Sequence, residues 1–161
     1  MNRNNTAMRI VPKKGDILLG KVISVGDKIS TILVSALMRN HGPLAPRPLP
    51  RTTHAYIFIR DVGYPCVRLG DMLKIGDLVL GLVKIDWFKP VFISFEGDIL
   101  GVVAAKCSNC GAIIPTPKDY NRLICPNCKN IRETKISVLY EPLLWSEIHK
   151  RYRIHIYPPV Q

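Results

Sequence analysis

Two Cys-x-x-Cys pairs constrain this chain more than any other feature of its sequence. Cys107 and Cys110 form the first pair, Cys125 and Cys128 form the second, and 14 residues lie between the pairs. Each pair places two sulfur atoms on one tight turn, and a hairpin of that length can return the second turn to the first. Zn²⁺ prefers four soft ligands at the corners of a tetrahedron, with each thiolate about 2.3 Å from the metal. The spacing therefore predicts one zinc ion bound by all four thiolates.

Two other chemistries use cysteines in related patterns. A thioredoxin-like redox centre needs only one Cys-x-x-Cys pair in a βαβ context, and an iron–sulfur cluster also takes four cysteines. Four thiolates leave no open coordination position, so the predicted metal is structural rather than catalytic. A module of about 30 residues buries too little surface to fold alone, so the metal supplies its folding energy. The fifth cysteine, Cys66, is interpreted as a small buried residue.

The residues that precede the cysteines alternate short β-rich segments with Gly-Asp and Pro turn signals. We expect strands at 15–25, 29–37, 54–62, 76–85 and 90–95, with room for one helical turn within 64–76. Residues 39–53 hold four prolines in eight positions, which excludes a helix or central strand and predicts an extended loop. Five short strands, one long connection and no long amphipathic helix predict a mostly β fold with a small closed barrel.

The chain is strongly basic, and the excess charge is unevenly placed. It has 161 residues, with 23 Lys and Arg against 12 Asp and Glu, for a net charge of +11. Residues 1–14 and 39–53 contain four and three positive charges and no acids, and residues 106–135 contain six against two. Lys and Arg on acid-free arms and loops release counterions from phosphates, so nucleic acid is the favoured partner. An anionic membrane surface is the second choice of partner, and a merely solvated surface is the remaining alternative.

Several classes of function lack their sequence signals. No run of about 18 apolar residues predicts a membrane span, and no apolar segment near the first residue predicts a secretory signal. We therefore expect a cytoplasmic protein with no membrane partner. The four histidines form no evident cluster with acids, and no nucleophile elbow, zinc-protease motif or phosphate-binding loop is present. We expect a protein that is not an enzyme and takes no small-molecule substrate.

The third predicted strand presents two different faces. Alternation places Ile57 and Ile59 on one face, which we expect to be core. Tyr56, Phe58 and Arg60 point the other way. If exposed, this row is a platform on which bases stack while the arginine contacts phosphate. The alternative is that the two aromatic side chains are buried under the ribbon or under residues 39–53.

Three further cations complete the predicted RNA-binding set. Arg47 and Arg51 lie within the proline-rich segment, and Lys84 lies near the end of the fourth predicted strand. Trp87 and Phe88 in the hairpin that follows have the same two interpretations as the platform aromatics.

The order of these segments resembles a known family. GDILLGKVISVGDKISTILV, AYIFIRDV, LKIGDLVLGLVKID and PVFISFEG together resemble an S1 domain, an OB-type RNA-binding barrel. SFEGDILGVVAAKCSNCGAII followed by LICPNCKN is more specific. A barrel that runs through such a linker into a four-cysteine ribbon resembles the S1-domain and zinc-ribbon cap subunit of the archaeal exosome. The resemblance covers roughly residues 12–137, and Phe58 stands where S1 motifs usually have histidine.

The resemblance implies a non-catalytic cap protein. In that family, three such subunits sit on a ring of phosphorolytic exoribonuclease subunits and feed RNA into its pore. The expected partners are then RNA and the ring and cap subunits of an exosome. The alternative is a ribosome-associated or transcription-linked RNA-binding protein, which basic arms and a zinc ribbon also fit.

The predicted organisation has five parts. These are a basic arm (1–14), an S1/OB-type barrel (15–96) with the insert 39–53, a linker (97–105), a four-cysteine zinc ribbon (106–137) and an extension (138–161). Within the extension, residues 151–156 alternate cationic and apolar side chains, as a strand does. The preceding residues of the extension, 143–150, have a helix as their structural option. The predicted strand pairs either within this chain or with the sheet edge of a partner.

Overall fold

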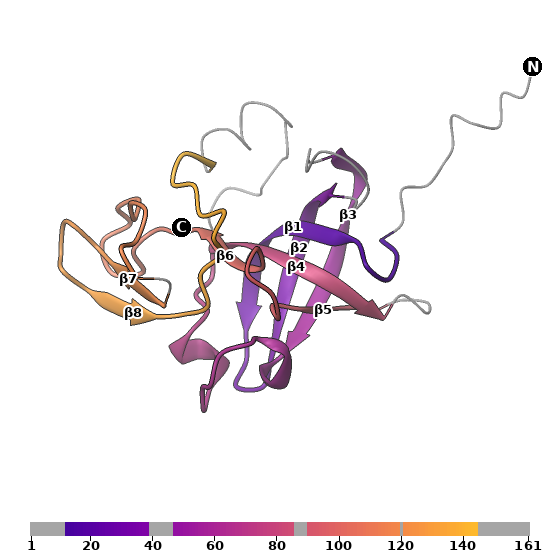
Figure 1. Cartoon of the computed structure of the whole chain (residues 1–161), viewed down its shortest axis with the longest axis horizontal. Helices are drawn as coiled ribbons and strands as arrows, with labels where there is room; N and C mark the ends of the chain where they lie inside the picture. Colours follow the sequence, from indigo (N-terminus) through magenta and orange to yellow (C-terminus); the bar gives the residue numbers. More distant parts are fainter. Residues whose placement is uncertain (1–11, 39–46, 86–89, 120, 145–161) are drawn as a thin grey trace, which may run out of the picture.

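The chain folds as a β-barrel with a small cysteine ribbon at one end (Figure 1). The structure is a computed structural model that describes residues 12–38, 47–85, 90–119 and 121–144. The mostly β fold class predicted from the sequence, an OB-like barrel followed by a four-cysteine cluster, is confirmed.

Five strands close the barrel. They are β1 (Ile17–Val25), β2 (Ile29–Met38), β3 (Arg47–Phe58), β4 (Leu78–Ile85) and β5 (Val91–Ser94). Their order around the barrel is β1-β2-β3-β5-β4, and β4 pairs with β1 to complete the ring. All of these pairings are antiparallel except β3 with β5, which pair in parallel at Ala55 and Tyr56. Closure satisfies the backbone of both would-be edge strands and encloses one apolar core.

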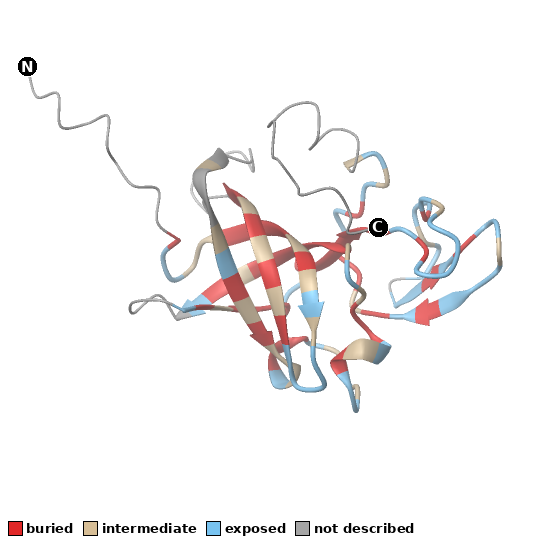
Figure 2. Cartoon of the chain, turned by 180° about the vertical axis from the view of Figure 1, so that it is seen from behind, coloured by how far each residue is buried: buried red, intermediate tan, exposed pale blue. Residues whose placement is uncertain are grey.

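The period-two alternation of apolar residues explains which face of each strand is buried. On β2, Ile32, Val34 and Ala36 are buried, while the residues between them are half-buried (Figure 2). On β3, Ala55 and Ile57 are fully buried in the same way. Each buried aliphatic side chain contributes about 1.5–3 kcal/mol relative to exposure. The barrel therefore contributes most of one continuous apolar core, as expected from the strand pattern, and this core extends to buried ribbon residues such as Leu123.

The third strand differs from its predicted limits at both ends. Residues 47–53, expected in a loop, form the first half of β3, where Arg47 pairs with Leu37 and Pro48 with Ala36. The register then shifts before Thr53 pairs with Val34. On its other side, β3 pairs with β5 only at Ala55 and Tyr56, so its first half is an irregular edge. Prolines are tolerated in such places, because no ladder needs their missing N–H.

The far end of the third strand is shorter than predicted. β3 ends at Phe58, and a 3₁₀ turn η2 (Ile59–Asp61) replaces the rest of the predicted strand 54–62. The Ile59 N–H donates to the carbonyl of Lys28 at 2.8 Å, which turns the chain away from the sheet. The helical turn expected within 64–76 is present as η3 (Leu69–Asp71).

Residues 97–105, predicted to be a linker, contribute a sixth strand. β6 (Gly101–Ala104) pairs antiparallel with β4 at Leu78, Val79 and Leu80. β5 is only four residues long and pairs with the other end of β4, which leaves room for β6 on the same edge. All four residues of β6 are buried. The apolar run in this segment is therefore sheet rather than connection.

The ribbon is built on two three-residue strands. β7 (Arg122–Ile124) and β8 (Ile131–Glu133) pair antiparallel, with Leu123 opposite Arg132. Leu123 is fully buried, whereas Ile124 and Ile131 are exposed on the outer face. Two such short strands form a hairpin that is at best marginal by itself.

A buried ion pair joins the ribbon to the barrel. The guanidinium of Arg132 donates to both carboxylate oxygens of Asp77, at 2.7 and 3.1 Å, and to the carbonyl of Met72 at 3.4 Å. Burial raises the pKa of Asp77, and the charge of Arg132 opposes that rise. The guanidinium is thus the main group that favours the charged form of a carboxylate only 1% exposed, and the backbone N–H of Lys74, which donates to Asp77 at 2.9 Å, acts in the same direction.

The chain after the ribbon returns to the barrel. Val102 N–H donates to Lys135 O at 2.9 Å, and Glu141 N–H donates to Val103 O at 2.8 Å. The Tyr140 hydroxyl donates to Ile114 O at 2.8 Å, which ties this segment to the ribbon. The first part of the extension therefore packs within the chain. The strand predicted at 151–156 lies outside the described residues, as does the predicted helix 143–150 beyond its second residue.

Candidate metal centre and nucleic-acid interface

The two cysteine turns have the same backbone design. In the first, Cys107 N–H donates to Ala112 O at 2.8 Å, and Gly111 N–H donates to Cys107 O at 2.9 Å. In the second, Cys125 bonds in the same way with Asn130 and Lys129, at 2.9 and 3.0 Å. Gly111 and Lys129 occupy equivalent positions, with φ of 77° and 65°. Each turn thus folds one Cys-x-x-Cys pair into a knuckle that directs both sulfurs to one point.

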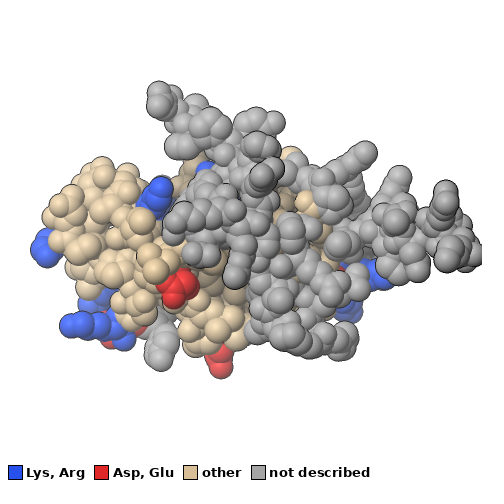
Figure 3. Space-filling view, turned by 90° about the horizontal axis from the view of Figure 1, so that it is seen from above, with Lys and Arg blue, Asp and Glu red and all other residues tan. Residues whose placement is uncertain are grey.

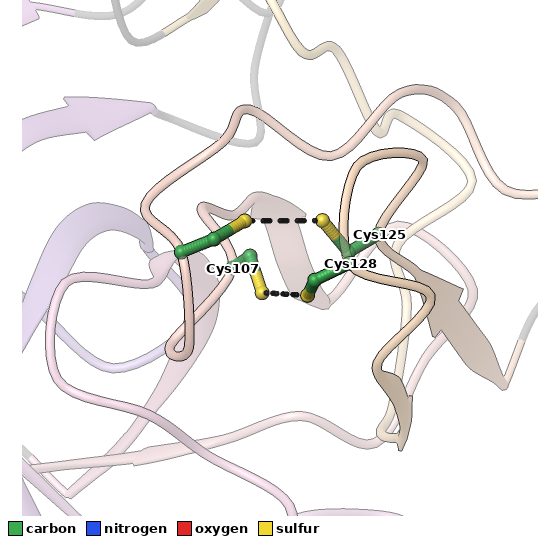
Figure 4. A group of neighbouring side chains, drawn as sticks. Cys107, Cys125 and Cys128 are labelled. Carbon is green, nitrogen blue, oxygen red and sulfur yellow. Dashed lines mark hydrogen bonds between the residues drawn. The ribbon is translucent and has the colours of Figure 1, made fainter.

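The four sulfur atoms meet between the knuckles (Figure 4). They all lie within 4.8 Å of one another, and the Cys107–Cys128 and Cys110–Cys125 pairs are both 3.4 Å apart. These distances exclude disulfides, whose sulfurs are about 2.05 Å apart. A tetrahedron with metal–sulfur bonds of about 2.3 Å has sulfurs about 3.8 Å apart. The four predicted ligands are therefore gathered at a spacing that fits one metal ion.

Hydrogen bonds prepare the cluster for deprotonation unevenly. The backbone N–H of Cys110 makes the largest contribution to a fall in the pKa of Cys107, to about 6. The backbone N–H of Cys128 likewise lowers the pKa of Cys125. Burial and the thiols of Cys110 and Cys128 outweigh it, and the pKa of Cys125 rises to about 11. A metal ion must displace the remaining protons, so its affinity falls as the pH falls.

A cluster of aromatic side chains lies on the barrel face predicted as a platform. Phe58 stacks on Phe92 with ring centroids 5.1 Å apart and an interplanar angle of 13°. Tyr56 lies beside the same ring, with centroids 6.1 Å apart and a tilt of 47°. All three side chains are half-buried. They are therefore not covered as core residues are.

Cations border this aromatic cluster. The guanidinium of Arg60 lies 4.9 Å from the centre of the Phe58 ring. Lys84 donates to the buried carboxylate of Asp61 at 2.8 Å, and Arg60 lies 3.8 Å from the same carboxylate. The Arg60 side chain is 77% exposed, so most of its hydrogen-bonding capacity faces solvent. We call Tyr56, Phe58, Arg60, Lys84 and Phe92 the aromatic patch.

The structure brings together four of the six predicted RNA contacts. Tyr56, Phe58, Arg60 and Lys84 share the aromatic patch, although Lys84 is held in an ion pair. The backbones of Arg47 and Arg51 belong to β3, but their side chains lie outside the described residues, as do Trp87 and Phe88.

Sequence reasoning missed Phe92, which lies at the centre of the patch. A signal was present in its segment, because Val91 and Ile93 alternate with Phe92 and are buried. Strand alternation alone would have turned Phe92 outward. The parallel pairing of Phe92 with Tyr56, which creates the cluster, required the barrel topology.

Cys66 lies outside the four-cysteine cluster. It is half-buried, whereas the sequence predicted a buried residue. Burial makes the largest contribution to a rise in its pKa. It lies in the loop that follows η2, close to Lys28 and Asp71.

The fold and the two sites define a class of protein, an OB-like barrel with an aromatic surface and a four-cysteine ribbon. Comparison of the chain with models of known protein families and with curated protein sequences gave no match. In the part of the chain that the structure describes, no helix has the length and apolar character needed to cross a membrane.

Proposed function

We propose that this protein binds single-stranded RNA through the aromatic patch. The observation that carries the proposal is the continuous stack of Phe92, Phe58 and Arg60 on one outer face of the barrel. Aromatic rings accept bases by stacking, each base contributing about 1–3 kcal/mol, and they do so with little regard to sequence. Arginine both stacks on bases and contacts phosphate. Binding of this kind is weakly selective and depends on salt.

Charge placement supports a polyanionic partner. Lys and Arg side chains lie at the ribbon end of the face in Figure 3 and again toward its other end, and acidic side chains are fewer on this face. Single strands lose affinity with salt at a slope of about −0.7 in log affinity per neutralised phosphate. Arg60→Gln should therefore reduce the salt slope by about 0.7. Arg122→Gln, which changes an exposed arginine of the ribbon hairpin, measures in the same assay whether the ribbon cations also contact RNA.

Fluorescence anisotropy with a labelled oligouridine of about ten nucleotides tests the proposal directly. Phe58→Ala should weaken binding by about 5- to 150-fold, equivalent to one lost stacking contact of about 1–3 kcal/mol. Circular dichroism checks that the barrel remains folded. Unchanged affinity in both Phe58→Ala and Phe92→Ala would contradict binding at this face. The double variant Arg47→Ala with Arg51→Ala tests whether the RNA-binding surface extends to the start of β3.

The same proposal assigns the metal. We infer one structural zinc ion held by Cys107, Cys110, Cys125 and Cys128, because an all-thiolate tetrahedral set favours zinc and leaves no position for a substrate. Metal analysis of the purified protein should return one zinc per chain. A coloured protein with iron and sulfide would contradict this assignment.

For the biological role, we propose the one that the order of barrel and ribbon supports. By its resemblance to exosome cap subunits, the protein acts as a non-catalytic adaptor that delivers RNA to a phosphorolytic ring in the cytoplasm. Affinity purification at native level, followed by mass spectrometry, tests this role. Ring and cap subunits among the partners support it. Ribosomal subunits or RNA polymerase in their place would reassign the protein, and turnover of labelled RNA by the isolated chain would make it an enzyme.

A further inference from the structure

A surface hollow lies next to the aromatic patch, and Arg60 belongs to both. It has a volume of about 510 Å³ and is lined by Lys28, Ile59, Arg60, Gly63, Tyr64, Pro65, Cys66 and Val67. We propose that this hollow, here called the loop pocket, receives the nucleotide adjacent to the one held at the aromatic patch. The inference rests on the proposed RNA-binding function and adds a second subsite to it.

The walls of the loop pocket are fixed by backbone hydrogen bonds. The turn between β1 and β2 is closed by Gly26 N–H donating to Ile29 O at 2.9 Å. Lys28 O then accepts from Ile59 N–H at 2.8 Å, and Asp27 O accepts from Leu69 N–H at 3.0 Å. The two loops that form the pocket are therefore tied to each other on both sides. A site formed in advance costs little ordering entropy on binding.

The lining suits one nucleotide of a strand. Ile59, Tyr64, Pro65 and Val67 offer apolar and aromatic surface, and Val67 is 78% exposed. Lys28 and Arg60 contribute two positive charges. A base needs an apolar or aromatic surface and its phosphate needs a cation, so the pocket offers both at once. Its volume falls within the range of about 300–1,000 Å³ that is usual for small-ligand sites.

Arg60 makes the two subsites continuous. Its guanidinium lies over the Phe58 ring, and the same residue lines the loop pocket. A phosphate held by Arg60 would thus join one nucleotide stacked on the patch to the next one in the pocket. The path leads toward the ribbon, because the Tyr64 hydroxyl at the pocket wall donates to Glu133 at 3.0 Å.

Cysteine labelling gives a direct readout of pocket occupancy. Cys66 lines the pocket and is the only cysteine outside the metal cluster. Its raised pKa slows alkylation, so labelling with a maleimide is followed at mildly alkaline pH, and peptide mass spectrometry separates Cys66 from the cluster. In a second variant, Val67→Cys in a Cys66→Ser background places a more exposed thiol in the same pocket. Ile75→Cys in that background is the matched control, since Ile75 is 70% exposed and does not line the pocket.

Oligouridine is added at about ten times its dissociation constant, where mass action leaves about a tenth of the sites free. We expect labelling at position 66, and at position 67 in its variant, to slow by about tenfold, with little change at position 75. Binding without protection at positions 66 and 67 would overturn the loop pocket and leave the proposed function standing. Equal protection at all three positions would also overturn it, as general shielding. Absence of any RNA binding at low salt would overturn both proposals.

A charge substitution tests the pocket by affinity. Val67→Asp places a carboxylate where a phosphate or base should lie, and its exposed position spares the fold. It should weaken oligouridine binding several-fold. Ile75→Asp carries the same charge on an equally exposed side chain outside the pocket and should change affinity little. Equal effects of the two variants would show that only overall charge matters, and would contradict the subsite.

Discussion

The barrel closes five strands of four to twelve residues into a ring, whereas the ribbon hairpin has two strands of three residues each. Most of the buried aliphatic side chains belong to the barrel. The ribbon has few of its own, namely Ile114, Leu123 and Ile136 beside two buried cysteines. One region is thus stabilised by apolar burial and a closed hydrogen-bond ring. The other depends on what holds its knuckles together and on its contacts with the barrel.

Removing the metal ligands should separate the two regions most sharply. Cys125→Ser should unfold the ribbon and leave the barrel's β signature largely intact, because only the barrel has a closed sheet and core of its own. The loss is large, since structural zinc sites in small domains are worth about 10–16 kcal/mol at neutral pH. Amide NMR spectra would show lost dispersion for residues 106–137, with shifts elsewhere limited to barrel residues that contact the ribbon, such as Asp77 and Val102. Ser108→Ala, between the first two ligands, is the control, and collapse of barrel resonances would contradict the comparison.

Breaking the ion pair should affect both regions together. Asp77→Asn leaves the buried guanidinium of Arg132 without its counter-charge, and such a loss costs about 3–5 kcal/mol. The midpoint of urea unfolding measures the effect. The exposed pair of Tyr64 and Glu133 provides the control, because Glu133→Gln should cost about 1 kcal/mol or less.

The double variant sharpens this test. Asp77→Asn with Arg132→Met removes both charges, so part of the loss should return. Additive losses in this double-mutant cycle would show that the two side chains do not act as a pair.

Gly101 tests how closely the ribbon's return segment packs on β6. Its φ is 121°, and a Cβ atom there would lie 2.5 Å from Lys135 O. Gly101→Ala must therefore move the backbone of one segment, with an expected cost of about 1–3 kcal/mol. Thermal unfolding measures it. Gly76→Ala is the matched control, since Gly76 also has positive φ but no atom within 4 Å of its Cβ position. Equal losses in both would attribute the effect to φ alone.

The smallest predicted effect compares the two knuckles. Lys129 occupies the left-handed position that Gly111 fills in the first knuckle. Left-handed backbone costs a residue with a Cβ atom about 1–2 kcal/mol. Lys129→Gly should therefore stabilise the ribbon by up to about 1 kcal/mol, and Gly111→Ala should destabilise it by a similar amount. Resistance of the four-cysteine metal site to a competing chelator measures both. Changes of the same sign would show that the knuckles are not equivalent.

The cysteine spacing determined the most about this protein. Four ligands in two short pairs form a local pattern, and each knuckle is closed by hydrogen bonds within six residues, such as Cys107 with Ala112. The five barrel strands were also predictable, because alternation and turn residues act over a few neighbours. β6 was missed because an apolar run like Gly101–Ala104 has no period, and only the free edge of β4 assigns it to the sheet.

Identifying the aromatic patch required both the sequence and the tertiary structure. The sequence placed Tyr56, Phe58 and Arg60 on one face of a strand, where side-chain alternation is local. Phe92 joined them only because β3 and β5, more than 30 residues apart in the chain, pair in parallel. The prolines of residues 47–53 were read as a loop, since local propensity does not reveal that this part of β3 lies at an edge.

The ion pair that joins the ribbon to the barrel was decided by the tertiary structure alone. Asp77 follows a Lys-Ile-Gly turn and Arg132 lies on a short ribbon strand, and each has the sequence context of an ordinary exposed residue. Their 55-residue separation leaves no local pattern that could pair them. Burial makes the pair specific, because a carboxylate removed from water needs a partner that only the packing of ribbon on barrel can bring within hydrogen-bond distance.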